Sequence, residues 1–215
     1  MRVVINGDNG LSLNNRAKFF KRLKLDSSDM VACDLVHGIK IKTVTKKDAG
    51  KIIIATDGLV TKEKNLILTV TAADCLPLYF FDQKQQVIGI AHAGWRGVWQ
   101  NLAGEMVLKM KKQFHCLPEN FNVYIGPHIK KCHFDINPEL SAQFEKYKKF
   151  LFNNSKSIKI DLSGIVRQQL IEAGIKKANI KVSPDCTYCH KKYFSNRRDK
   201  PKVVEAMMGY IILGR

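Results

Sequence analysis

The sequence lacks the features that mark membrane-spanning, exported and low-complexity proteins. No apolar run approaches the ~20 residues that a membrane-spanning helix needs. The N-terminal stretch MRVVINGDNGLSLNN has no cationic start followed by an apolar core, so it does not predict a signal peptide. Repeats and low-complexity stretches are absent as well. We therefore expect the 215 residues to form a single domain, 1–215, that stays in the cytoplasm as a monomer or homodimer.

Acidic residues are scarce. Nineteen Asp and Glu stand against 36 Lys and Arg, which gives a formal net charge of +17. Such a field attracts anions, including nucleic acids, phosphorylated metabolites and acidic membrane surfaces. The basic residues are spread along the chain, and no block interleaves them with aromatic residues as a platform for single-stranded nucleic acid does. We therefore expect no membrane partner, and nucleic-acid binding is an alternative that we do not favour.

The cysteines do not predict a disulfide framework, because a chain without an export signal keeps its thiols reduced. The six are Cys33, Cys75, Cys116, Cys132, Cys186 and Cys189. The segment CTYCH at 186–190 has the spacing of a haem-attachment motif, but attachment normally takes place outside the cytoplasm. We expect ordinary thiols there, with a second zinc site through Cys186, Cys189 and His190 as an alternative.

Apolar periodicity predicts an α/β fold with a mixed sheet covered by helices. Strands are expected at 30–38, 51–60, 65–75, 76–82, 86–92, 121–127, 179–183 and 208–213. Helices are expected at 14–25, 95–112, 138–152 and 161–174.

Three potential metal ligands follow or end predicted strands: His37, Cys75 and His92. Strand ends of one sheet can converge, and open α/β sheets commonly bind ligands there. Two imidazoles and a thiolate suit zinc, and three protein ligands leave the fourth tetrahedral position open for catalysis. Zinc held in this way lowers the pKa of bound water to ~7.

Two other interpretations of these three residues remain open. Cys75 could be a small buried apolar residue, with the histidines as hydrogen-bonded core residues. Alternatively, Cys75 could be a nucleophile with His92 as its base.

The segment GWRG at 94–97 opens a predicted helix, whose first amides favour an anion. Gly94 and Gly97 allow close backbone approach, and Arg96 adds a planar fork suited to phosphate or carboxylate. The alternative is that Trp95 belongs to the core and Arg96 is a solvated surface charge.

Several motifs resemble those of the laccase-domain or polyphenol-oxidase-like proteins, a family regarded as purine nucleoside phosphorylases. The matching segments are NNR at 14–16, VHG at 36–38, ATDGLVT at 55–61, TAADCLPLYFFD at 71–82, GIAHAGWRG at 89–97, YIGPHIKKCHFDI at 124–136, DL at 161–162, CT at 186–187 and FSNRRD at 194–199. The chain departs from the family at His128, where a cysteine is common, and at 200–202, where Gly-Arg is usual.

The resemblance implies an α/β sandwich related to the fold of cysteine hydrolases. It implies zinc bound by His37, Cys75 and His92. It also implies phosphorolysis of adenosine, inosine and methylthioadenosine to free base and ribose 1-phosphate, with adenosine deamination.

The remaining site residues are assigned by their positions beside these motifs. Asp74 is a candidate acid–base or ligand-positioning residue, and Arg96 is a candidate anion binder. Asp57 either positions a ligand or forms a turn. The rival functions are a copper-dependent polyphenol oxidase, a cysteine hydrolase using Cys75 and His92, and a non-enzymatic nucleic-acid-binding protein. Copper is also possible as an adventitious or alternative metal.

Overall fold

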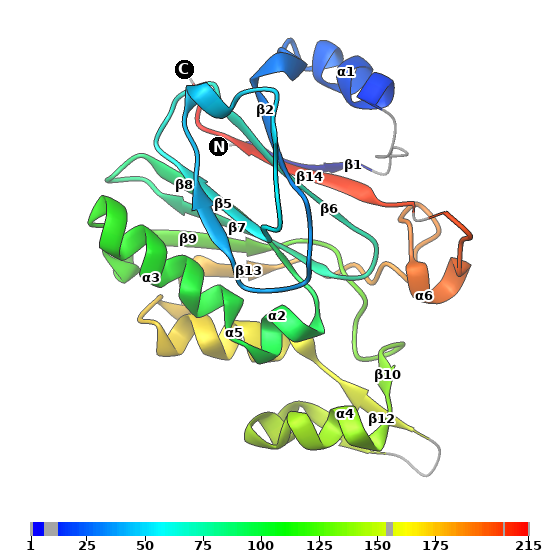
Figure 1. Cartoon of the computed structure of the whole chain (residues 1–215). Helices are drawn as coiled ribbons and strands as arrows, with labels where there is room; N and C mark the ends of the chain where they lie inside the picture. Colours follow the sequence, from blue (N-terminus) through cyan, green and yellow to red (C-terminus); the bar gives the residue numbers. More distant parts are fainter. Residues whose placement is uncertain (1, 7–12, 154–156, 204, 215) are drawn as a thin grey trace.

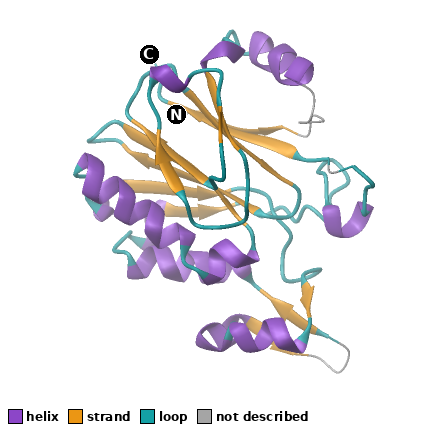
Figure 2. Ribbon diagram, viewed as in Figure 1, coloured by secondary structure: helices purple, strands orange, loops and turns teal. Residues whose placement is uncertain are grey.

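Two large β-sheets face each other in the computed structural model (Figures 1 and 2). The structure describes residues 2–6, 13–153, 157–203 and 205–214. The first sheet has the strand order β1 (Arg2–Asn6), β14 (Met207–Ile212), β6 (Ile67–Ala72), β2 (Met30–Cys33) and β4 (Ile52–Ile53). The second has the order β13 (Ile180–Val182), β9 (Phe121–Ile125), β7 (Leu76–Asp82), β8 (Val87–Ala93), β5 (Gly58–Thr61) and β3 (Ile41–Thr43).

Helices cover the outer faces of both sheets, so the layers run helix, sheet, sheet, helix (Figure 1). Helix α1 (Leu13–Arg22) packs Phe19 and Phe20 against the five-stranded sheet. Helices α3 (Leu102–Phe114) and α5 (Leu162–Glu172) cover the six-stranded sheet. The predicted α/β fold is confirmed, with two large mixed sheets where one was expected.

The central strands β7 and β8 are buried on both faces, which explains their continuous apolar sequences. Leu78 and Phe80 point into the core shared with α3 and α5. Tyr79 and Ile90 point into the core between the two sheets. This alternation follows from the two-residue period of a strand.

A smaller unit extends from the helix layer and lies at the bottom of Figure 1. It contains β10 (Asp135–Ile136), α4 (Pro138–Gln143), β11 (Leu151–Asn153) and β12 (Ile158–Ile160), with the strand order β10-β12-β11. The remaining helices are α2 (Trp95–Trp99), α6 (Asn196–Asp199) and short 3₁₀ turns at Ser27–Asp29, Lys46–Asp48, Pro118–Asn120, Glu145–Phe150 and Lys177–Asn179.

Several sequence predictions were wrong in extent. The strand predicted at 30–38 ends at Cys33, so His37 lies in a loop. The stretch 51–60 divides into β4 and β5, which belong to different sheets. The helix predicted at 138–152 ends at Gln143, and the chain continues as a 3₁₀ turn and then as β11.

Among the described residues, no helix is both long enough and apolar enough to cross a membrane.

Candidate metal centre and pocket

The three predicted metal ligands meet in space. One ligand atom from each of His37, Cys75 and His92 lies within 4.8 Å of the others. Cys75 is the residue before β7, and His92 is the penultimate residue of β8, where it pairs with Pro77 of the neighbouring strand. The rings of His37 and His92 are 4.7 Å apart and nearly perpendicular.

The loop that follows β2 brings His37 to the ends of β7 and β8. His37 adopts a left-handed backbone conformation with φ 57°, which turns the chain sharply toward this site. The amides of His37 and Gly38 both donate hydrogen bonds to the carboxylate of Asp57, each over 2.8 Å. Asp57 therefore fixes the loop that carries the first ligand.

Asp57 also contacts the third ligand. Its Oδ1 atom lies 3.5 Å from Nδ1 of His92, and its carbonyl accepts the His92 amide over 2.8 Å. Burial of the carboxyl alone would raise its pKa, but the hydrogen bonds from His92, Gly38 and His37 hold the pKa below its usual value. The ionised carboxylate is thus placed to orient His92, a common arrangement behind metal-binding histidines.

The thiol of Cys75 is ready to ionise. Desolvation of its sulfur opposes the thiolate, but hydrogen bonds with His37 and His92 lower its pKa to about 7. Burial likewise opposes protonation of His92, while Asp57 and Cys75 raise the pKa of this imidazole to about 9. A metal ion can take the place of the shared proton, because metal binding needs a thiolate and neutral imidazoles.

Gly94 leaves room for the cluster. A Cβ atom at this position would lie 2.9 Å from Cδ2 of His37 and 3.3 Å from Sγ of Cys75. Any larger residue would therefore press on two of the ligands. The donor set, its spacing and this open approach fit a zinc ion held by three protein ligands.

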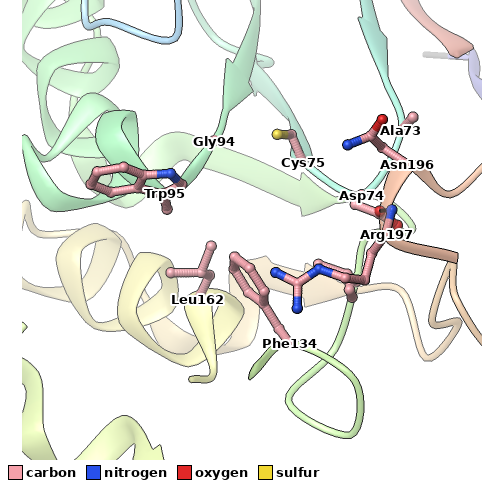
Figure 3. Close-up of a pocket in the computed structure, with 10 residues that line it drawn as sticks. Ala73, Asp74, Cys75, Gly94, Trp95, Phe134, Leu162, Asn196 and Arg197 are labelled. Atoms are coloured by element: carbon pink, nitrogen blue, oxygen red, sulfur yellow. Dashed lines mark hydrogen bonds between the residues drawn. The ribbon is translucent and has the colours of Figure 1, made fainter. Parts of the chain in front are cut away.

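A pocket of about 140 Å³ lies directly beside the cluster (Figure 3). Its lining comes from five parts of the chain: Ala73, Asp74, Cys75, Gly94, Trp95, Ile129, Phe134, Leu162, Asn196 and Arg197. Figure 3 shows Leu162 and Phe134 on the side opposite Cys75, with Trp95 closing one end and Arg197 the other. The pocket is thus apolar in the middle, with thiol and guanidinium groups at its rim.

Asp74, the predicted acid–base or positioning residue, lies in the pocket lining and is buried. Its Oδ1 atom accepts a hydrogen bond from Thr187 over 2.6 Å. Its Oδ2 atom accepts hydrogen bonds from the Ser195 hydroxyl over 3.1 Å and from the Arg197 amide over 2.7 Å. These contacts tie the segment containing α6 to the end of β6, so Asp74 positions the polar rim of the pocket.

The structure separates the two arginines that bear on anion binding. Arg96, the predicted anion binder, is exposed and lies over the Trp95 ring, 4.2 Å from its centroid, outside the pocket lining. Arg197 lines the pocket, lies over Phe134 and donates a hydrogen bond to the Asp135 carbonyl. Sequence reasoning missed Arg197, although the FSNRRD segment contained it.

The alternative second zinc site is not formed as predicted. His190 lies 3.8 Å from Asp185 and is outside the cluster that contains Cys186 and Cys189. Cys132 and His133 complete that cluster instead.

The fold and the site together define an α/β protein with a candidate metal centre at the strand ends of its six-stranded sheet. The family model described as "Multi-copper polyphenol oxidoreductase laccase" matches residues 6–214. The chain belongs to this family.

Named relatives cover most of the chain. Purine nucleoside phosphorylase YlmD of Geobacillus stearothermophilus is 33% identical in an alignment of 202 positions that covers 87% of this chain and 74% of the relative. Adenosine deaminase RL5, from an unknown prokaryotic organism, is 28% identical over 89% of this chain and 79% of the relative. The crystal structure of YlmD from G. stearothermophilus superposes with a TM-score of 0.90 at 31% identity, covering 97% of this chain and 82% of that one. The chain is an enzyme of this family.

Proposed function

We propose that this chain is a zinc-dependent purine nucleoside phosphorylase. It cleaves adenosine, inosine or methylthioadenosine with phosphate to the free base and ribose 1-phosphate, and it deaminates adenosine as a second activity. The observation that carries the proposal is the position of the pocket, whose aromatic walls end at the cluster of His37, Cys75 and His92. The name of the YlmD relative supports the phosphorolysis, and that of the RL5 relative supports the deamination.

The pocket has the chemistry that a nucleoside requires. Trp95 and Phe134 offer flat aromatic surfaces, and Leu162 adds an apolar wall, all of which suit a purine base. Asn196 and Arg197 supply hydrogen-bond donors at the rim, where a ribose and an anionic phosphate would be bound. The base would lie between the apolar walls and the phosphate near Arg197.

His37, Cys75 and His92 would hold the zinc ion. When bound, zinc supplies Lewis-acid catalysis, which stabilises negative charge that develops on the substrate. Asp57 keeps the His92 imidazole oriented, and Asp74 keeps Arg197 at the pocket rim. Arg96 is exposed and lies over the Trp95 ring, where its positive charge would attract phosphate toward the pocket.

The description of the family names copper, but this chain has too few histidines for a multicopper centre, so we favour a site for one metal ion. A multicopper oxidase combines a blue copper site with a three-copper cluster, which consumes many histidines. This chain has six, and of these only His37 and His92 belong to the cluster beside the pocket. We propose copper only as an adventitious or alternative ion.

A cysteine hydrolase is the second candidate, because Cys75 and His92 would form a thiolate–imidazolium pair in the absence of a metal ion. A simple dyad of these two residues needs no second histidine. His37 therefore discriminates between the two proposals.

The test is product identification with the purified chain, adenosine and phosphate. We expect adenine and ribose 1-phosphate from phosphorolysis and inosine from deamination. Both activities should be lost in Cys75→Ala and His37→Ala, together with reduced zinc content. Full activity of His37→Ala, with a covalent substrate adduct at Cys75 in metal-free protein, would favour the hydrolase. A copper-to-protein ratio near four with strong blue absorbance would favour the oxidase.

A further inference from the structure

A second cluster of metal-ligating side chains lies outside the pocket. One ligand atom from each of Cys132, His133, Cys186 and Cys189 lies within 4.8 Å of the others. None of the four is used by the proposed reaction. Cys132 and His133 lie between β9 and β10, and the cysteine pair lies in the turn region after β13, more than fifty residues further along the chain.

The two sulfur–sulfur distances from Cys132 match the edges of a metal-centred tetrahedron, and the two sulfur–nitrogen distances are a few tenths of an ångström shorter. Zinc with Zn–S bonds of ~2.3 Å and a Zn–N bond of ~2.1 Å places its sulfurs ~3.8 Å apart and its sulfur–nitrogen pairs ~3.6 Å apart. Here Sγ of Cys132 lies 3.6 Å from that of Cys186 and 3.8 Å from that of Cys189. Nδ1 of His133 lies 3.2 Å from the Cys132 sulfur and 3.3 Å from the Cys189 sulfur.

We propose that these four residues bind a structural zinc ion as a Cys₃His site. Four protein ligands close the coordination shell, which distinguishes this site from the three-ligand cluster beside the pocket. Nδ1 of His133 is the ligand nitrogen, because it is the ring atom that faces the sulfurs. The His133 ring stacks on Tyr188, with centroids 4.0 Å apart, and this contact holds its orientation.

The backbone around the site is arranged for metal-bound sulfur. The Lys130 amide points at the Cys186 sulfur over 3.4 Å, a donor that stabilises a thiolate. His128 and Cys186 form a parallel β-bridge, and the Thr187 amide donates to the His128 carbonyl over 3.1 Å. The two segments are therefore held side by side by backbone contacts before any ion binds.

Two lysines near the site offset part of its charge, and Lys159 also lies 3.9 Å from the carboxylate of Asp135. Three thiolates and one divalent zinc ion carry a net charge of −1. The Lys159 ammonium donates to the Cys132 carbonyl over 2.7 Å, and the Lys130 ammonium donates to the Ser183 carbonyl over 2.6 Å. Both cations lie on the segments that carry the ligands or directly against them.

The ion would hold together two segments that carry or support residues lining the proposed nucleoside pocket. The first segment also carries Ile129 and Phe134, which line the pocket. The second carries Thr187, which donates to Asp74. Removal of this ion should therefore weaken substrate binding more than it slows the chemical step.

The test counts zinc in the full-length protein after loading and desalting. We expect two zinc ions per chain in the unsubstituted protein, one in Cys189→Ser, one in Cys75→Ser and none in the double variant. Cys33→Ser is the matched cysteine control and His190→Ala tests the sequence-adjacent histidine; both should retain two. Cys189→Ser should raise KM for the nucleoside by a larger factor than it lowers kcat.

Cobalt substitution gives a second measurement that needs no variant to fold. The Cys₃His site should contribute the larger part of the thiolate-to-cobalt charge-transfer absorbance, because it has three thiolates against one in the other cluster. A single zinc per chain that Cys75→Ser abolishes would overturn the proposal. A Cys132–Cys186 or Cys132–Cys189 disulfide found by mass spectrometry, with one zinc per chain, would overturn it as well.

Discussion

Asp57 contacts the backbone of one candidate ligand and the side chain of another. Its carboxylate accepts the amides of His37 and Gly38, while Oδ1 faces Nδ1 of His92. Loss of one carboxylate oxygen would leave an amide group facing these donors. The residue is therefore expected to act on the metal through the ligands that it orients.

We predict that Asp57→Asn lowers zinc affinity by about 10–100-fold, the usual effect of changing a group that orients a metal ligand. Competition with a chromophoric chelator measures this affinity, and kcat/KM should fall in parallel at limiting zinc. Asp48→Asn is a suitable control, because the Asp48 carboxylate caps a turn at Thr45 and lies beside Lys51 rather than beside a candidate metal ligand. Unchanged zinc affinity in Asp57→Asn would show that the carboxylate only shapes the loop.

The sequence predicted the candidate metal ligands because each belongs to a short motif at or near a strand end. Arg197 could not be placed in the same way, since its position depends on its amide contact with Asp74, more than one hundred residues away. The pairing of Cys132 with Cys186 was equally hidden, because it depends on how two loops lie side by side. Spacing along the chain detects ligands within one motif and misses those that only the fold brings together.

At the next scale, the helix predicted at 95–112 divides into α2 and α3. Asn101 interrupts it in a left-handed conformation, with φ 65° and ψ 41°, and its side chain accepts the Gly104 amide to begin α3. The apolar spacing from Trp95 to Met110 continues across the break, so periodicity alone does not reveal it. The break allows α2 to begin directly after Gly94, beside two of the candidate metal ligands, while α3 lies along the six-stranded sheet (Figure 1).

We predict that Asn101→Ala destabilises the protein by about 1–2 kcal/mol, because it removes the cap and leaves a Cβ-bearing residue in the left-handed region. Asn101→Gly should cost only a few tenths of a kcal/mol, since glycine tolerates this conformation. Urea unfolding curves measure both free energies. Equal destabilisation by the two substitutions would show that neither the cap nor the conformation governs this break.

The sequence predicted the strands of the two large sheets better than it predicted the smaller unit that contains β10, α4, β11 and β12. The strands β6, β7, β8 and β14 are buried on both faces along almost their whole length, and such runs are visible without knowledge of their partners. In the stretch 138–152, Phe144 and Tyr147 are buried at a helix-like spacing. The chain nevertheless leaves the helix there because Leu151–Asn153 pairs with β12, a contact that local periodicity does not contain.

At the scale of the whole molecule, the two-sheet arrangement brings the site together. Cys75 and His92 come from adjacent strands of the six-stranded sheet, and His37 comes from a loop that leaves the five-stranded sheet. Asp57 directly precedes β5, and its carboxylate contacts both the amide of His37 and the ring of His92. The candidate metal centre therefore forms only when both sheets are in place, so global unfolding and metal loss should coincide.

The basic residues behind the net charge of +17 are spread along the chain, and this spread bears on how the chain should interact with nucleic acid. We predict that the chain binds duplex DNA weakly and without sequence specificity, and that this binding is detectable at low salt. At physiological salt the Kd should be about 10⁻⁶–10⁻⁴ M or weaker, because such binding depends on phosphate contacts and counterion release. Fluorescence anisotropy across a salt series measures it, and nucleoside turnover in the same buffers should change far less. Lys109→Ala, which removes one of the dispersed charges of α3, should alter neither quantity much. Submicromolar DNA or RNA binding at physiological salt, together with no turnover of adenosine and phosphate, would replace the enzyme proposal with a nucleic-acid-binding function.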